Sequence, residues 1–98
     1  MATSKRILRI ELTPELTAAI RRLPERERRK IGQAITAVRD GFGTPHLHAG
    51  LGIRRLRGSL FECRVALKLR LIFDAEFGVL SFSDVGSHDQ IRKIIKGR

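Results

Sequence analysis

The sequence predicts an α+β fold, in which an N-terminal helical hairpin packs on one face of a small antiparallel sheet and a short helix ends the chain. Three observations support this prediction. Apolar residues recur at helical spacing before residue 41, alternating residues cover 61–74, and a capped helix start lies at Ser87. The 98 residues show no internal repeat and no linker, so we expect residues 1–98 to form a single domain.

The N-terminal part is predicted to be one short strand followed by two helices. Residues 7–12 alternate weakly, as a strand does. Residues 13–15 (Thr-Pro-Glu) then form a helix start, with a hydroxyl at the N-cap, proline at the first helical position and an acid in the first turn. Pro24 separates this helix from a second one, which ends at the glycines of residues 40–43. The apolar stripe of the second helix consists of Ile31, Ala34, Ile35 and Val38.

The middle of the chain changes from helix to strand. Residues 44–52 hold one proline, two glycines and two histidines, and this composition predicts a loop. Strand patterning begins at Ile53, with a turn expected at residues 58–59. The alternating run 61–74 is too long for one typical strand. We favour two strands joined by a tight turn at residues 66–68, and one long bent strand is the alternative.

The chain is expected to end in a strand and a helix. Residues 76–78 (Glu-Phe-Gly) predict a turn, and residues 79–85 predict the last strand. Residues 87–90 (Ser-His-Asp-Gln) have the form of a capping box, with a hydroxyl at the N-cap and a glutamine three residues later. The terminal helix that they begin carries Ile91, Ile94 and Ile95.

The charge of the chain points to a polyanionic partner. Twenty Lys and Arg residues stand against ten Asp and Glu residues, which gives a net charge of +10 and a pI near 11.4. Most of the cations are arginines, whose guanidinium groups contact phosphate in a bidentate manner. The partner is therefore expected to be a nucleic acid or an acidic protein.

Other classes of protein are disfavoured by composition. A single cysteine, Cys63, excludes an intrachain disulfide and a cysteine-rich zinc site, and its place in an alternating run predicts burial. His46 and His48 lack a further clustered ligand, so we predict neither a metal site nor a cofactor. No apolar run reaches the length of a membrane span and residues 1–9 do not form a signal peptide, so we expect a cytoplasmic protein with no membrane partner.

Four short segments in the second half of the chain resemble the RelE/ParE toxin family. The family has a basic glycine turn, a strand bearing basic residues, an "R-L-V-Y"-like strand, and a last strand that ends in a glycine and histidine or arginine element. The corresponding segments here are Arg54-Arg55-Leu56-Arg57-Gly58, Phe61-Glu62-Cys63-Arg64-Val65, Leu69-Arg70-Leu71-Ile72-Phe73 and Val85-Gly86-Ser87-His88-Asp89. The N-terminal strand and helical hairpin also fit the family, so the resemblance covers most of the chain.

The resemblance implies one of two activities. RelE-like members cut messenger RNA, often on the ribosome, whereas ParE-like members inhibit DNA gyrase and are not nucleases. Both kinds are neutralised by a cognate antitoxin protein. For this chain the resemblance implies a metal-independent endoribonuclease, in which the 2′-hydroxyl attacks the adjacent phosphate. A gyrase inhibitor and an inactive module that binds nucleic acid or antitoxin are the alternatives.

The candidate site residues follow from this chemistry. Arg64, Lys68 and Arg70 share the same parity along their run, so we expect them to form a cationic cluster on the face away from the helices. Three arginines from the neighbouring turn are expected to add RNA contacts: Arg54, Arg55 and Arg57. His88 is the candidate acid, as in several RelE-like nucleases, because imidazole exchanges protons near neutral pH.

Some assignments stay open at the level of sequence. The general base is either Glu62 or Lys68, and Glu62 is at least as compatible with a structural ion pair to a neighbouring arginine. His46 and His48 have the alternative role of lining the RNA groove. The chain also departs from the family, because it has no Tyr, whereas family nucleases often carry one near the C-terminus. Ile94 or Ile95 occupies the comparable region, which puts stacking on an RNA base in doubt.

Overall fold

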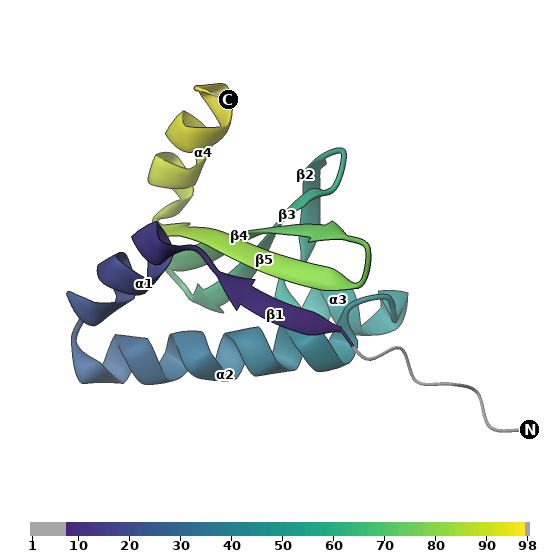
Figure 1. Cartoon of the computed structure of the whole chain (residues 1–98), viewed down its shortest axis with the longest axis horizontal. Coiled ribbons are helices and arrows are strands. Elements are labelled where there is room, and N and C mark those ends of the chain that lie inside the picture. The colour runs from purple at the N-terminus through teal and green to yellow at the C-terminus, as the bar shows by residue number, and fades with distance from the viewer. Residues whose placement is uncertain (1–7, 98) are drawn as a thin grey trace, which may run out of the picture.

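The computed structural model describes residues 8–97, so Ile7 of the predicted first strand lies outside the described residues. In this part of the chain five strands and four helices follow one another (Figure 1). They are β1 (Arg9–Leu12), α1 (Pro14–Arg21), α2 (Glu25–Gly41), α3 (Pro45–Leu51), β2 (Arg54–Arg57), β3 (Leu60–Ala66), β4 (Leu69–Glu76), β5 (Val79–Gly86) and α4 (His88–Lys96).

The strands form one sheet in the order β1-β5-β4-β3-β2. Strands β2 to β5 pair with their neighbours in antiparallel fashion, whereas β1 runs parallel to β5, with Arg9 opposite Val79 and Leu12 opposite Phe82. The α+β fold class is confirmed, and the sheet is mixed rather than wholly antiparallel. Three helices and three strands separate β1 from β5 in the chain, and so long a connection permits parallel pairing.

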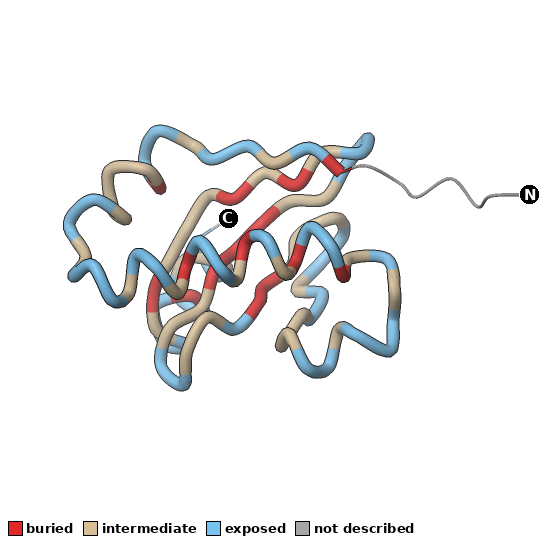
Figure 2. The backbone as a smooth tube through the Cα atoms, turned by 90° about the horizontal axis from the view of Figure 1, so that it is seen from below, coloured by how far each residue is buried: buried red, intermediate tan, exposed pale blue. Residues whose placement is uncertain are grey.

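The helices lie on both sides of this sheet (Figure 1). Helices α1 and α2 cover one face, as predicted for the helical hairpin. The main core lies between these helices and the strands. Leu16 of α1 and Ile31 of α2 are buried there with Phe73 and Phe82 of the central strands. Figure 2 shows the buried segments running along the inner side of α2 and through the middle of the sheet. Burial of this apolar surface is the main favourable term in folding.

Helix α4 rises from the opposite face and contacts β4 and β5. Ile72 of β4 and Ile91 of α4 are both buried, with 0% and 1% of their surface exposed, and neither belongs to the main core. They hold α4 against the outer face of the sheet. The helix begins with the predicted capping box: the Ser87 hydroxyl accepts the Gln90 N–H at 3.2 Å, and the Gln90 side chain accepts the Ser87 N–H at 2.7 Å.

The predicted turns between the strands are confirmed. Strands β2 and β3 are joined at residues 58–59, and β3 and β4 at residues 67–68, so the long alternating run consists of two strands. Strands β4 and β5 are joined at Phe77 and Gly78, which have φ angles of 52° and 75°. Positive φ at two consecutive residues is the type I′ geometry, which matches the twist of a hairpin.

The predicted loop at residues 44–52 is wrong, because Pro45–Leu51 forms the short helix α3. Proline breaks a helix when it stands in the helix interior. Here Pro45 stands in the first helical turn, where no backbone hydrogen bond is lost. Gly52 ends the helix in the left-handed conformation, with φ at 65°. No helix within residues 8–97 is long and apolar enough to span a bilayer.

Candidate RNA-binding face of the sheet

The centre of the candidate site is a row of charged residues across β2, β3 and β4. Arg54 on β2 lies opposite Glu62 on β3. Two residues along β3, Arg64 lies opposite Arg70 on β4. Cys63, between the two β3 positions, belongs to the main core, so Glu62 and Arg64 project from the face that carries α4.

Glu62 is buried and ion-paired. Its side chain is 3% exposed, and its Oε2 atom lies 3.2 Å from NH2 of Arg54 and 3.6 Å from NH1 of Arg70. The two guanidiniums are more accessible, with 63% of the Arg54 side chain and 21% of the Arg70 side chain exposed. One carboxylate oxygen therefore holds two cations that come from the strands on either side of it.

Arg64 is exposed and is held close to the start of β2. A Cβ atom on Gly52 would lie 2.6 Å from Cβ of Arg64 and 3.3 Å from its Nε. The backbone at Gly52 approaches this closely only because the residue has no side chain and adopts a positive φ. Arg64 and Arg70 thus present like charges side by side on one face.

His88 begins α4 at the end of this row. Gly86, the last residue of β5, lies opposite Arg70, and His88 follows it by two residues. The imidazole is exposed, and no hydrogen bond or ion pair engages it within the described part of the chain. The fold thus brings His88, Arg64 and Arg70 to the same end of the sheet from β5–α4, β3 and β4.

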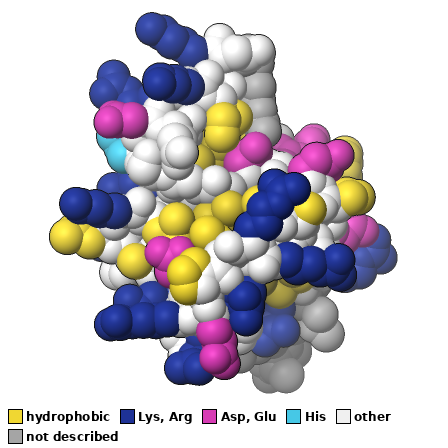
Figure 3. Space-filling model, turned by 90° about the vertical axis from the view of Figure 1, so that its left-hand side faces the viewer, with side chains coloured by type: hydrophobic (Ala, Val, Ile, Leu, Met, Phe, Trp, Pro, Cys, Tyr) yellow, Lys and Arg dark blue, Asp and Glu magenta, His cyan; other side chains and the backbone are white. Residues whose placement is uncertain are grey.

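An open groove of about 550 Å³ lies between β2 and α4. Arg54 and Glu62 form part of its wall on the sheet side. The other lining residues are Leu56, Asp89, Ile91, Arg92, Lys93, Ile95 and Lys96. The lining thus carries four cations, two acids and three aliphatic residues, and no aromatic side chain. Figure 3 shows Lys and Arg side chains spread around a hydrophobic patch on the side of the molecule that carries α1 and α4.

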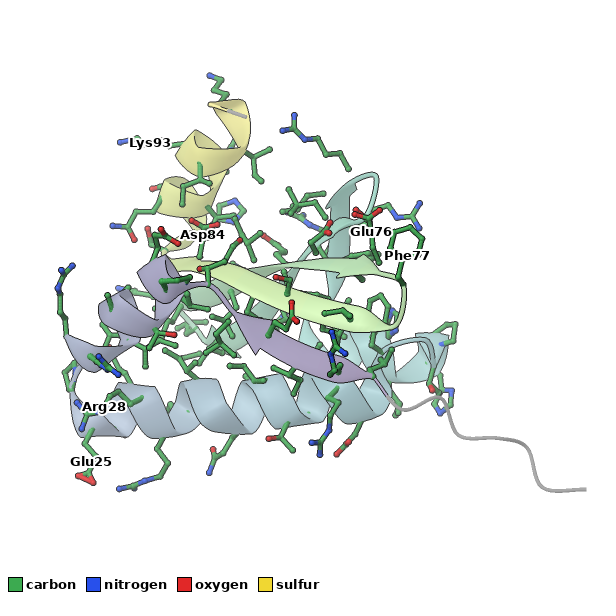
Figure 4. All side chains as sticks on the ribbon, viewed as in Figure 1. Glu25, Arg28, Glu76, Phe77, Asp84 and Lys93 are labelled. Carbon is green, nitrogen blue, oxygen red and sulfur yellow. The ribbon has the colours of Figure 1, made fainter. Side chains whose placement is uncertain are left out.

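The α4 residues of this groove were not among the predicted site residues. Their signal in the sequence is the spacing of four between Ile91 and Ile95 and between Arg92 and Lys96, which places one apolar and one basic row along the helix. Lys93 also projects from α4 (Figure 4). Whether these rows face the sheet depends on how α4 docks, which the pattern alone does not determine.

Lys68 is not brought to this face. It lies in the turn between β3 and β4 and lines a hollow on the α2 side with Arg26, Glu27 and Lys30. The register shifts between Arg64 and Ala66, and this bulge with the two-residue turn breaks the alternation. The parity argument that grouped Lys68 with Arg64 and Arg70 is therefore wrong.

The three β2 arginines are also divided. They belong to a strand rather than to a turn. Arg54 lies on the face that carries α4, whereas the Arg55 guanidinium lies 5.5 Å from the centre of the Phe61 ring, which packs against the main core. Arg57 is exposed at the end of β2, beyond a register shift. Of the three predicted RNA contacts, only Arg54 adjoins the Glu62 cluster.

The two loop histidines have structural positions in α3. The Nε2 atom of His48 accepts a hydrogen bond from the Gly43 N–H at 3.0 Å, and its ring stacks on Phe42 with the ring centres 5.6 Å apart. His46 is exposed. Within residues 8–97, no group of three or more His, Cys, Asp or Glu side chains is arranged to hold a metal ion.

Cys63 is buried, as predicted. Burial raises the pKa of its thiol from an ordinary value of 9.0 to about 12, against the smaller opposite effect of a backbone hydrogen bond at Leu71. The thiolate is therefore disfavoured at neutral pH, and Cys63 is a core residue rather than a nucleophile.

No protein-family sequence model matches the chain, and no curated protein sequence does. Solved structures do match it. A chain of the archaeal RelE–RelB complex from Pyrococcus horikoshii is 15% identical, with a TM-score of 0.68, over 83% of this chain and 94% of that one. The RelB–RelE antitoxin–toxin complex from Methanococcus jannaschii gives 14% identity and a TM-score of 0.64, over 86% and 96% of the two chains.

The DinJ–YafQ toxin–antitoxin complex from Escherichia coli is similar to the same extent. It gives 18% identity and a TM-score of 0.62, over 87% of this chain and 97% of that one. These alignments cover almost the full length of the solved chains, so the likeness concerns the whole fold and not one motif. The chain therefore has the RelE-like toxin fold.

Proposed function

We propose that the protein is the toxin of a type II toxin–antitoxin pair and that it cleaves messenger RNA without a metal ion. The observation that carries the proposal is the placement of Arg54, Arg64 and Arg70 on one face of the sheet, at whose end His88 stands exposed. Structures with the same fold belong to toxin–antitoxin complexes, which supports an antitoxin as the protein partner.

The proposed reaction needs charge stabilisation and a proton donor. The 2′-oxygen bonds to phosphorus while its proton passes to a solvent base, and the bond from phosphorus to the 5′-oxygen breaks. Arg64 and Arg70 stabilise the negative charge that grows on the phosphoryl oxygens. His88 donates a proton to the leaving 5′-oxygen. The products are a 2′,3′-cyclic phosphate and a 5′-hydroxyl end. Lys68 lines the hollow on the α2 side of the sheet, so it is not part of the proposed site.

The charge of the molecule supports the substrate class. A net charge of +10 favours association with RNA, either as free message or on the ribosome, and messenger RNA places the action in the cytoplasm. The same cations suit an antitoxin with an acidic segment, which would compete with RNA for Arg54, Arg64 and Arg70.

Cleavage of end-labelled RNA by the purified protein in the presence of EDTA tests this function. The His88→Gln variant is expected to lower the rate by about 100-fold or more, because general acid catalysis commonly contributes that much. His46→Gln is the matched control, since His46 is also an exposed histidine and lies in α3. Product ends that lack a cyclic phosphate, or full activity in His88→Gln, would contradict the mechanism.

One feature favours a second candidate, an inhibitor of DNA gyrase. The groove has no aromatic lining residue on which an RNA base could stack. In that case expression of His88→Gln would still arrest growth, and the arrested cells would show gyrase-linked DNA damage with intact messenger RNA.

A further inference from the structure

Glu62 stands out because an acid lies buried on the most basic face of the sheet. Removing a carboxylate from water is costly, and a buried acid is retained only when it is paired. Its two partners, Arg54 and Arg70, are both nearer to solvent than the carboxylate is. Glu62 is thus the least accessible member of the cluster.

The geometry of the cluster is not the one that gives the strongest ion pair. An arginine and a carboxylate bind best as a bidentate pair that uses both oxygens. Here Oε2 of Glu62 serves both arginines, while Oε1 of Glu62 and Nε of Arg70 are buried without a hydrogen-bond partner in the described chain. One acid is divided between two cations, and the Arg54 side chain, 63% of which is exposed, keeps N–H groups that can bind another anion.

The same geometry argues against Glu62 as the general base. A base must lie within hydrogen-bond reach of the proton that it removes. One oxygen of Glu62 is held by two guanidiniums, and the other is buried. Glu62 therefore offers a substrate hydroxyl no carboxylate oxygen that is both exposed and free of an ion pair.

We infer that Glu62 is a positioning residue, whose carboxylate holds the Arg54 and Arg70 guanidiniums in place to receive RNA phosphates. This inference rests on the proposed RNA site. Arg54, Arg64 and Arg70 come from three neighbouring strands and repel one another. The carboxylate lowers that repulsion and restricts the rotamers of two flexible side chains before RNA arrives. Less ordering is then needed when the phosphate binds.

The inference makes a prediction opposite to that of simple electrostatics. Glu62→Gln removes a negative charge from an RNA-binding face, and net charge alone would strengthen RNA binding. If Glu62 acts by positioning, binding weakens by about 10-fold, the size of one charge-assisted hydrogen bond. Glu11→Gln is the matched control, because Glu11 pairs with Arg9 at 3.3 Å on an exposed strand far from the groove. It is expected to leave binding unchanged or slightly stronger.

A double-mutant cycle separates positioning from any direct role. The affinity for a short 2′-O-methyl RNA, which cannot be cleaved, is measured by fluorescence anisotropy for Glu62→Gln in the wild type and in Arg54→Ala/Arg70→Ala. A positioning residue loses its effect once both arginines are absent. An equal effect in the two backgrounds, or tighter binding by Glu62→Gln, would overturn the inference.

Two further measurements keep the test decisive. Thermal unfolding shows which variants are folded, and Glu62→Asp, which keeps the charge but draws it back by one methylene, replaces Glu62→Gln if that variant does not fold. Cleavage rates are measured in parallel. A wild type that shows the coupling but cleaves no RNA contradicts the ribonuclease proposal alone, whereas a wild type that cleaves RNA without the coupling contradicts only the role of Glu62. A wild type that does not bind RNA contradicts both.

Discussion

Arg64 on β3 lies directly opposite Arg70 on β4, and both side chains stand on the face that carries α4. Like charges at opposed positions of a sheet destabilise it. Glu62 compensates Arg54 and Arg70 through ion pairs, whereas Arg64 is the most exposed cation of the β3–β4 pair. An arrangement of this kind costs stability in the free protein and favours a polyanion, and this relation underlies the first prediction.

Arg64→Gln is expected to weaken RNA binding without loss of stability. The free energy of unfolding should stay within about 0.5 kcal/mol of the wild type or rise slightly, because an exposed repulsion is removed. The slope of the logarithm of the binding constant against the logarithm of salt concentration should fall by about 0.7, the value for one phosphate contact on a single strand. Anisotropy titrations with 2′-O-methyl RNA between about 50 and about 200 mM salt measure this slope.

Arg39→Gln is the control for that experiment. Arg39 is an exposed arginine on α2 and pairs with Asp40 at 3.1 Å. An unchanged salt slope for Arg64→Gln, or an equal change for Arg39→Gln, would show that Arg64 contacts no phosphate.

Gly52→Ala is expected to destabilise the protein by about 1–3 kcal/mol, because the new Cβ meets Arg64 at 2.6 Å and the backbone has a positive φ. Gly32→Ala is the matched control, since that position lies in α2 with no atom within 4 Å of the added Cβ. It should stabilise by about 0.5–1 kcal/mol through helix propensity. Urea unfolding measures the stability of both variants. If Gly52→Ala lost less stability than Gly32→Ala gained, the close packing at Gly52 would be contradicted.

Ser87→Ala is expected to fray the start of α4. The loss of the N-cap hydroxyl costs about 1 kcal/mol and leaves the Gln90 N–H without its partner. Amide hydrogen exchange should accelerate at residues 88–91 and stay unchanged in α1. Because His88 is the first residue of this helix, the cleavage rate should fall along with the protection. Ser87→Thr retains a hydroxyl and should behave as the wild type.

The Cys63 thiol is expected to stay unreactive in the native state and to make stability fall at high pH. Burial raises its pKa to about 12 in the folded protein, so above pH 9 the unfolded chain loses the thiol proton while the folded chain keeps it. The unfolded state then binds fewer protons, and the free energy of unfolding decreases as pH rises, by at most about 1.4 kcal/mol per pH unit. Below pH 9 the thiol is protonated in both states, and this contribution is fully present.

Comparison with Cys63→Ala isolates this effect from the titration of lysines. The variant should lose part of the alkaline slope, measured by urea unfolding at a series of pH values. Rapid modification of native Cys63 by a thiol reagent at neutral pH would contradict the burial.

Local chemistry made most of the elements predictable. The Thr13 and Ser87 hydroxyls cap α1 and α4 as expected, because a cap depends only on residues within one helical turn. The turn at Phe77–Gly78 is equally local. The prediction missed the short helix α3 because proline and glycine usually break helices. Here Pro45 and Gly52 stand at the two ends of the helix instead.

The candidate site was predictable only in part. The parity of Arg64 and Arg70 within their own strands places them on one face, and that expectation agrees with the register. Parity failed for Lys68, because a bulge and a turn intervene. Arg54 and Arg55 were expected in a turn, where parity does not apply, whereas in strand β2 they lie on opposite faces. The roles of these residues remain predictions until the variants are measured.

The sequence by itself determined the α+β class, the capped helices, the hairpin turns and the cationic character of β2 to β4, since each depends on neighbours in the chain. Only the tertiary structure decided that β1 joins the sheet parallel to β5, that α4 docks through Ile91 on the outer face, and that Glu62 lies between Arg54 and Arg70. Each of these depends on contacts between segments far apart in the sequence. Their pairing is set by how the whole core closes, and no local pattern records it.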